Sequence, residues 1–67
     1  MPQGTLTHYR ADRAFGFIAQ DSGGPDMFVH IKAFPLGTMP EAGMRVVYDV
    51  AVSPRSGKLE AVDVRVL

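Results

Sequence analysis

The sequence predicts an all-β protein, and within that class a five-stranded antiparallel barrel. Five short segments have the composition of β-strands, whereas no segment has the apolar periodicity of a long helix. Glycine- and proline-rich turns separate these segments. A chain of 67 residues has one core to fill, and closing the sheet removes the edges that so small a sheet exposes. The strand count and the length fit the OB architecture.

The first three strands are expected before the middle of the chain, at residues 4–10, 15–20 and 27–31. The first is rich in threonine and offers Leu6 to the core. The turn at residues 21–26 is the strongest turn signal in the chain, because four turn formers precede a proline that cannot donate a ladder hydrogen bond.

A short connection and two further strands complete the expected barrel. Lys32-Ala33-Phe34 can form one helical turn, which Pro35 ends, and a loop follows to Gly43. The segment 45–52 is the clearest strand because it is β-branched and alternates in part. The last strand, 59–67, places three valines at period two. The residues expected on one face of these two strands are Val46, Tyr48, Val50, Val62, Val64 and Val66.

Composition limits the function. Seven Lys and Arg residues balance seven Asp and Glu residues, so binding of nucleic acid by bulk charge is disfavoured and any such binding must come from local placement and stacking. There is no cysteine, which suits a reducing compartment, and no apolar run is long enough to span a membrane. We expect one domain, residues 1–67, in the cytoplasm.

An aromatic set occupies the face that the core does not need. Residues i and i+2 share a face of a strand, so Phe15 and Phe17 lie on one face of the second strand. Phe28 and His30 share a face of the third strand, while its aliphatic residues point to the opposite face. Because the aliphatic face forms the core, the aromatic face is predicted to be a binding surface.

These residues resemble the bacterial cold-shock domain family over nearly the whole chain, from Gly4 to Leu67. Two ribonucleoprotein-like motifs stand in the family's order, with a matching turn and last strand. The matching residues are Phe15-Gly16-Phe17-Ile18, Phe28-Val29-His30, Gly23-Gly24-Pro25-Asp26, Ala61 and Val64. The resemblance implies an OB barrel that binds single-stranded RNA and DNA with little sequence preference, as an RNA chaperone or in control of transcription or translation.

The chain departs from the family pattern at four places. His8 replaces the tryptophan that stacks a base, and Arg13-Ala14 replaces the usual lysine-glycine. Ile31 follows the motif histidine, where an aromatic residue is common. The loop after the third strand lacks the family's phenylalanine, and only Leu36 or Met39 can take its place. With His8 in place of the tryptophan, we expect an affinity nearer micromolar than nanomolar.

The residue types of the candidate face suit single-stranded nucleic acid. Aromatic rings stack bases, and basic side chains follow the phosphates. Asp26 can accept a hydrogen bond from an exocyclic base amine, as this position does in the family, and Arg55 or Lys58 can reach in from a turn. The residues predicted to bind are Phe15, Phe17, Phe28, His30, Tyr9, His8, Arg13, Arg10, Asp26 and Lys32.

The same residues also fit a function other than nucleic-acid binding. A diverged barrel can serve as a module for protein contact or dimerisation, or as the N-terminal domain of a longer protein, with the aromatic face as the interface. The loop Pro35–Gly43 is then a hinge for strand exchange, although a monomer is the expected state. An enzyme is not expected, because the sequence shows no metal-ligand spacing, no catalytic triad and no phosphate-binding glycine loop, and no cofactor is implied.

Overall fold

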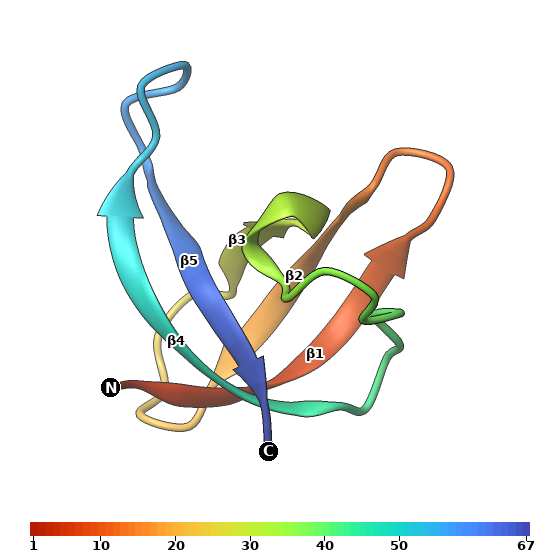
Figure 1. Cartoon of the computed structure of the whole chain (residues 1–67). Helices are drawn as coiled ribbons and strands as arrows, with labels where there is room; N and C mark the ends of the chain where they lie inside the picture. The colour runs from red at the N-terminus through yellow and green to blue at the C-terminus, as the bar shows by residue number, and fades with distance from the viewer.

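The computed structural model describes all 67 residues and contains a closed five-stranded barrel (Figure 1). The predicted all-β fold is confirmed, and each strand lies within a residue or so of its expected position. A 3₁₀ turn follows the third strand, where a helical turn was expected. The elements are β1 (Gln3–Arg10), β2 (Phe15–Gln20), β3 (Met27–His30), η1 (Ile31–Ala33), β4 (Arg45–Val52) and β5 (Leu59–Val66).

The expectation of a purely antiparallel barrel is wrong. The strand order around the barrel is β1-β2-β3-β5-β4, and β3 pairs with β5 in parallel while all other neighbours are antiparallel. The reason is geometric. Each antiparallel neighbour reverses the strand direction, and an odd number of reversals around a closed ring cannot return to the starting direction. A closed barrel of five strands therefore needs at least one parallel pair.

Hydrophobic side chains from all five strands fill the barrel, and Phe34, which follows η1, belongs to the same buried cluster with 7% of its surface exposed. The largest side chain in the core belongs to Tyr48, whose hydroxyl is buried without a hydrogen-bond partner. Burial raises the pKa of this phenol, because the charged form would lose its hydration. The buried hydrophobic residues are Leu6, Ile18, Met27, Val29, Phe34, Val46, Tyr48, Ala61 and Val64.

A shift of register in β5 changes which valines face the core. Ala61 and Val64 are both buried, three positions apart, because the pairing of β4 with β5 shifts between Val47 and Asp49. Between these two pairs β5 contains one residue more than β4, which is a β-bulge. Asp63 lies in the bulge and has a φ of 50°, a left-handed conformation that bulge residues can adopt. The expected alternation of the last strand is therefore wrong, and Val66 is 41% exposed.

Gly16 allows β1 to approach β2 closely. Its position is buried, and a Cβ atom there would overlap the backbone carbonyl oxygen of His8 and lie 3.2 Å from Cδ1 of Leu6. Glycine is thus required by packing between two strands rather than by an unusual φ. The neighbouring Ala14 has the opposite problem, since it is a non-glycine residue with a φ of 58°. The family's glycine would fit Ala14's conformation at no steric cost.

An ion pair joins the end of β2 to the start of β4 on the outside of the barrel. The guanidinium of Arg45 donates to both carboxylate oxygens of Asp21, over 2.7 and 2.6 Å, and also to the hydroxyl of Thr5. The hydrogen bonds from Arg45 hold the pKa of Asp21 below its usual value of 3.8.

This ion pair predicts an acid-sensitive contribution to stability. Because the folded state lowers the pKa of Asp21, the contribution is complete above pH 3.8 and is lost as the pH falls through the folded-state value. We expect Asp21→Asn to flatten the fall of the melting temperature in acid, measured by circular dichroism from neutral pH downward. Asp12→Asn is the control, because Asp12 has only a loose 3.6 Å contact with Arg10. Equal effects of the two substitutions would contradict the assignment.

No helix in the structure has the length and apolar character needed to cross a membrane.

Candidate nucleic-acid interface

Two cross-strand rows form the outer face of β1, β2 and β3. Residues directly opposite one another in neighbouring strands point to the same side of the sheet. In the upper row, Phe15 lies between Arg10 of β1 and His30 of β3. In the lower row, Phe17 lies between His8 and Phe28. The parallel pairing with β5 extends the lower row, because Glu60 is opposite Phe28. We call these residues the outer face: His8, Arg10, Phe15, Phe17, Phe28, His30 and Glu60.

The three phenylalanine rings form one cluster at the centre of the outer face. The rings of Phe15 and Phe28 are stacked, with centroids 5.6 Å apart and an interplanar angle of 29°. The ring of Phe17 meets both edge to face, at 6.0 and 5.9 Å. All three are partly exposed, unlike Phe34, which is in the core. Such rings support one another and still present surface to a planar ligand.

Tyr9 is not brought onto the outer face. It lies opposite Gly16, which is buried, and its side chain packs against the hydrophobic core. The cause is a shift of register in β1 between Leu6 and His8, which leaves one residue more on β1 than on β2. As a result His8, rather than Tyr9, shares a row with the phenylalanines. A simple alternation along residues 4–10 could not show this.

A groove borders the outer face on the side of β5. It has a volume of about 540 Å³ and runs between the phenylalanines and the β4–β5 connection. In the view of Figure 1, this connection and the β1–β2 turn project from the same end of the barrel, with η1 between them. Asp26, which immediately precedes β3, also lines the groove. Its lining residues are Phe17, Asp26, Phe28, His30, Ser53, Arg55, Ser56, Lys58, Leu59 and Glu60.

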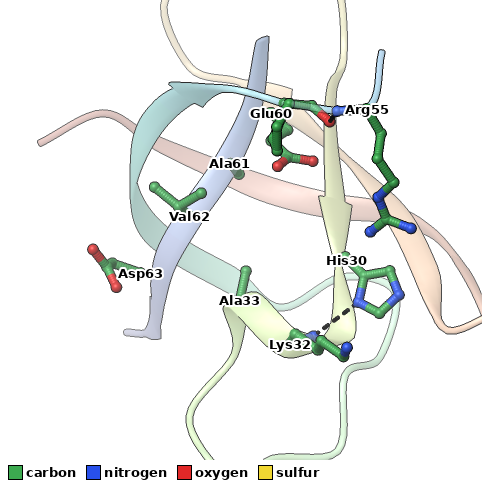
Figure 2. Close-up of a pocket in the computed structure, with 10 residues that line it drawn as sticks. His30, Lys32, Ala33, Arg55, Glu60, Ala61, Val62 and Asp63 are labelled. Carbon is green, nitrogen blue, oxygen red and sulfur yellow. Dashed lines mark hydrogen bonds between the residues drawn. The ribbon is translucent and has the colours of Figure 1, made fainter. Parts of the chain in front are cut away.

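His30 is held in one orientation by the turn that follows it. Its Nδ1 accepts a hydrogen bond of 3.1 Å from the backbone N–H of Lys32, as the N-cap of η1 (Figure 2). In the neutral ring the proton is then on Nε2, which is left free to donate. The outer face thus contains an oriented hydrogen-bond donor beside its aromatic rings. A second hollow of about 340 Å³ lies next to it, between His30, Lys32, Arg55 and Glu60.

The cations of the chain are concentrated around the outer face although the net charge is zero. Only Arg10 and Arg45 take part in ion pairs, and the Arg45 pair lies away from the outer face. Arg13 is in the β1–β2 turn, and Lys32 follows His30. Both are exposed, as are Arg55 and Lys58 at the groove. The predicted binding residues are thereby brought together, apart from Tyr9, and Arg55 and Lys58 join them.

Glu60 is the residue of this surface that the sequence did not reveal. It lines both hollows and continues the row that contains Phe17 and Phe28. Its position depends on the parallel pairing of β3 with β5, which joins segments far apart in the chain. No local pattern contains that information. No group of three or more side chains in the structure is arranged to hold a metal ion.

Comparison with known proteins gives one consistent result. The sequence model of one protein family, the "'Cold-shock' DNA-binding domain", matches residues 2–67. Cold shock protein CspA of Rhizobium meliloti is 36% identical over 67 residues, which cover 97% of each chain. Cold shock protein ScoF of Streptomyces coelicolor is 36% identical over 63 residues, covering 90% of this chain and 92% of its own. Cold shock-like protein CspA of Rickettsia typhi is 38% identical over 66 residues, covering 94% and 90%.

Proposed function

This chain belongs to the cold-shock domain family, a family of nucleic-acid-binding domains, and we propose that its outer face binds single-stranded RNA and DNA with low sequence specificity. The binding is by stacking of bases on Phe15, Phe17 and Phe28. A role as an RNA chaperone or as a regulator of transcription or translation in the cytoplasm is the biological form that we propose for this activity.

The observation that carries the proposal is the aromatic cluster on a face that the core does not use. Its three rings lie within 5.6 to 6.0 Å of one another and are bordered by unpaired cations. A double helix hides its base faces inside the stack, whereas a single strand presents them to such rings. The outer face therefore suits unpaired nucleotides rather than a duplex.

Magnitudes set the expected affinity. Stacking on aromatic side chains is worth about 1–3 kcal/mol per base, so the three phenylalanines supply about 3–9 kcal/mol before the costs of ordering. We expect a dissociation constant near micromolar, which corresponds to about −8 kcal/mol. Arg10 is already paired with Asp12, which leaves a small set of basic side chains around the rings to contact phosphates. The logarithm of the binding constant should therefore fall with the logarithm of salt concentration with a slope of about −1 to −3, at roughly −0.7 for each phosphate contact.

Fluorescence anisotropy tests the proposal directly. The chain is titrated into a labelled oligothymidylate or oligouridylate heptamer at low salt, with a hairpin duplex of the same label as the control. We expect saturable binding to the single strands and much weaker binding to the duplex. Absence of binding to either heptamer at about 100 µM protein would refute the proposal.

His8 offers a variant that should gain affinity. It is exposed and lies opposite Phe17 in the lower row, where the family has a stacking tryptophan. A larger ring there adds a platform, so we expect His8→Trp to tighten heptamer binding by about 1 kcal/mol, or roughly fivefold. The chain has no other tryptophan, so quenching of the new fluorophore by the oligonucleotide provides a second readout. Tighter binding without quenching would show that His8 does not face the bases.

A further inference from the structure

Glu60 places an anionic side chain inside a surface that is otherwise suited to a polyanion. It is directly opposite Phe28 across the parallel β3–β5 pair, and it lines the groove that contains Phe17 and Phe28. Figure 2 shows its carboxylate directed into the hollow that it shares with His30 and Arg55. The side chain is only partly exposed.

The carboxylate of Glu60 is not used within the protein. The chain has two ion pairs, Arg10 with Asp12 and Arg45 with Asp21, and Glu60 takes part in neither. Arg55 shares the groove with Glu60 without an ion pair between them. The groove contains a second unpaired carboxylate, that of Asp26. Two carboxylates, both able to accept hydrogen bonds, therefore line the groove that Phe28 borders.

The chemistry of a carboxylate restricts what it can contact in a nucleic acid. An ionised carboxylate only accepts hydrogen bonds, and it repels phosphate oxygens. Cytosine, adenine and guanine offer an exocyclic amine as donor, and a carboxylate accepts well from the N4 amine of cytosine. Uracil and thymine have no exocyclic amine, and the single ring N–H that they present lies between two carbonyl oxygens that repel a carboxylate.

From this arrangement we infer that Glu60 makes the groove select bases with an exocyclic amine over uracil and thymine at the position stacked on Phe28. The inference rests on the proposed function and adds a base preference to it. Arg55 and Lys58 do not offset this preference. They lie on the exposed β4–β5 connection, where phosphates are their natural partners. Glu60 instead belongs to a strand, and its backbone is fixed by pairing with both β3 and β4.

Competition between two matched heptamers tests the inference. Oligodeoxycytidylate and oligodeoxyuridylate have the same sugar and the same ring size, and they differ in the donor and acceptor pattern of the base edge. We expect the wild-type chain to bind the cytidylate about three- to tenfold more tightly, the range that one net hydrogen bond allows. In Glu60→Gln the amide can either donate or accept, so the ratio should fall clearly below the wild-type value, and any preference that remains is the contribution of Asp26.

A charge-matched control separates base reading from general repulsion. Glu41→Gln removes the same charge from the exposed loop before β4, outside the groove, and should leave the ratio unchanged. Equal wild-type affinities for the two heptamers, or an unchanged ratio in Glu60→Gln, would overturn the inference while leaving the proposed function intact. A third comparison uses oligoribocytidylate and oligodeoxycytidylate, which differ only in the 2′-hydroxyl. If Glu60→Gln changed the relative affinity for these two strands but not the relative affinity for cytidylate and uridylate, the carboxylate would contact the sugar rather than the base, and the inference would be overturned. Failure of both heptamers to bind would instead refute the proposed function.

Discussion

Phe28→Ala is expected to weaken binding of a single-stranded heptamer by tenfold or more, the largest loss of any single substitution on the outer face. Phe28 is stacked with Phe15 at 5.6 Å and meets Phe17 edge to face at 5.9 Å, and it also borders the groove. Its removal takes away one platform, worth about 1–3 kcal/mol, and loosens the two rings that pack against it. Phe17→Ala should lose more than about 1 kcal/mol by the same argument.

Two conservative variants distinguish stacking from apolar contact. Phe28→Tyr keeps the aromatic face and should bind within about threefold of the wild type, whereas Phe28→Leu keeps most of the apolar volume and should lose nearly as much as Phe28→Ala. Anisotropy gives the affinities, and thermal melting shows whether each variant remains folded. Because Phe28 is on the outer face and does not belong to the buried core, the melting temperature should change little compared with the affinity. Equal binding by the leucine and tyrosine variants would argue against stacking.

Gly16→Ala is expected to lower the free energy of unfolding by about 1–3 kcal/mol, a large share of the stability of so small a domain. The added Cβ would overlap the carbonyl oxygen of His8, and backbone cannot move away as easily as a flexible side chain. Overpacking of this kind costs about 1–3 kcal/mol, and a domain of this size has only a few kcal/mol of stability. Urea unfolding followed by circular dichroism measures the loss.

The neighbouring position provides a control of opposite sign. Ala14 has a left-handed φ of 58°, which costs a residue with a Cβ about 1 kcal/mol, so Ala14→Gly should stabilise the fold by up to that amount. Its carbonyl accepts a hydrogen bond of 2.9 Å from the N–H of Ile31, which fixes the β1–β2 turn against the end of β3. If Gly16→Ala were as stable as the wild type, the result would contradict the close packing of β1 against β2 at Gly16.

The local patterns of the sequence were sufficient for the strands and for the aromatic face. Alternation in residues 15–18 and 27–30 separates Ile18 and Val29, which are buried, from the partly exposed Phe17 and Phe28. These strands are short and regular, so a period of two describes them fully.

Irregular pairing accounts for what the sequence could not show. The register shifts in β1 and β5 each reverse the side to which the following residues point, so Tyr9 turns toward the core and Val66 away from it. A bulge has no reliable local signature when the residue involved is not glycine, as at Asp63. The position of Glu60 beside Phe28 follows from barrel closure, which depends on the whole chain.

The most direct test of the central claim is to map binding residue by residue. Backbone amide shifts of the labelled protein are followed by NMR as a single-stranded heptamer is added. We predict that the largest changes fall on His8, Phe15, Phe17, Phe28 and His30, together with the groove residues near Glu60, while the amides around Asp21 and Arg45 change little. Changes concentrated at Asp21 and Arg45, or spread evenly over the barrel, would contradict the assignment of binding to the outer face.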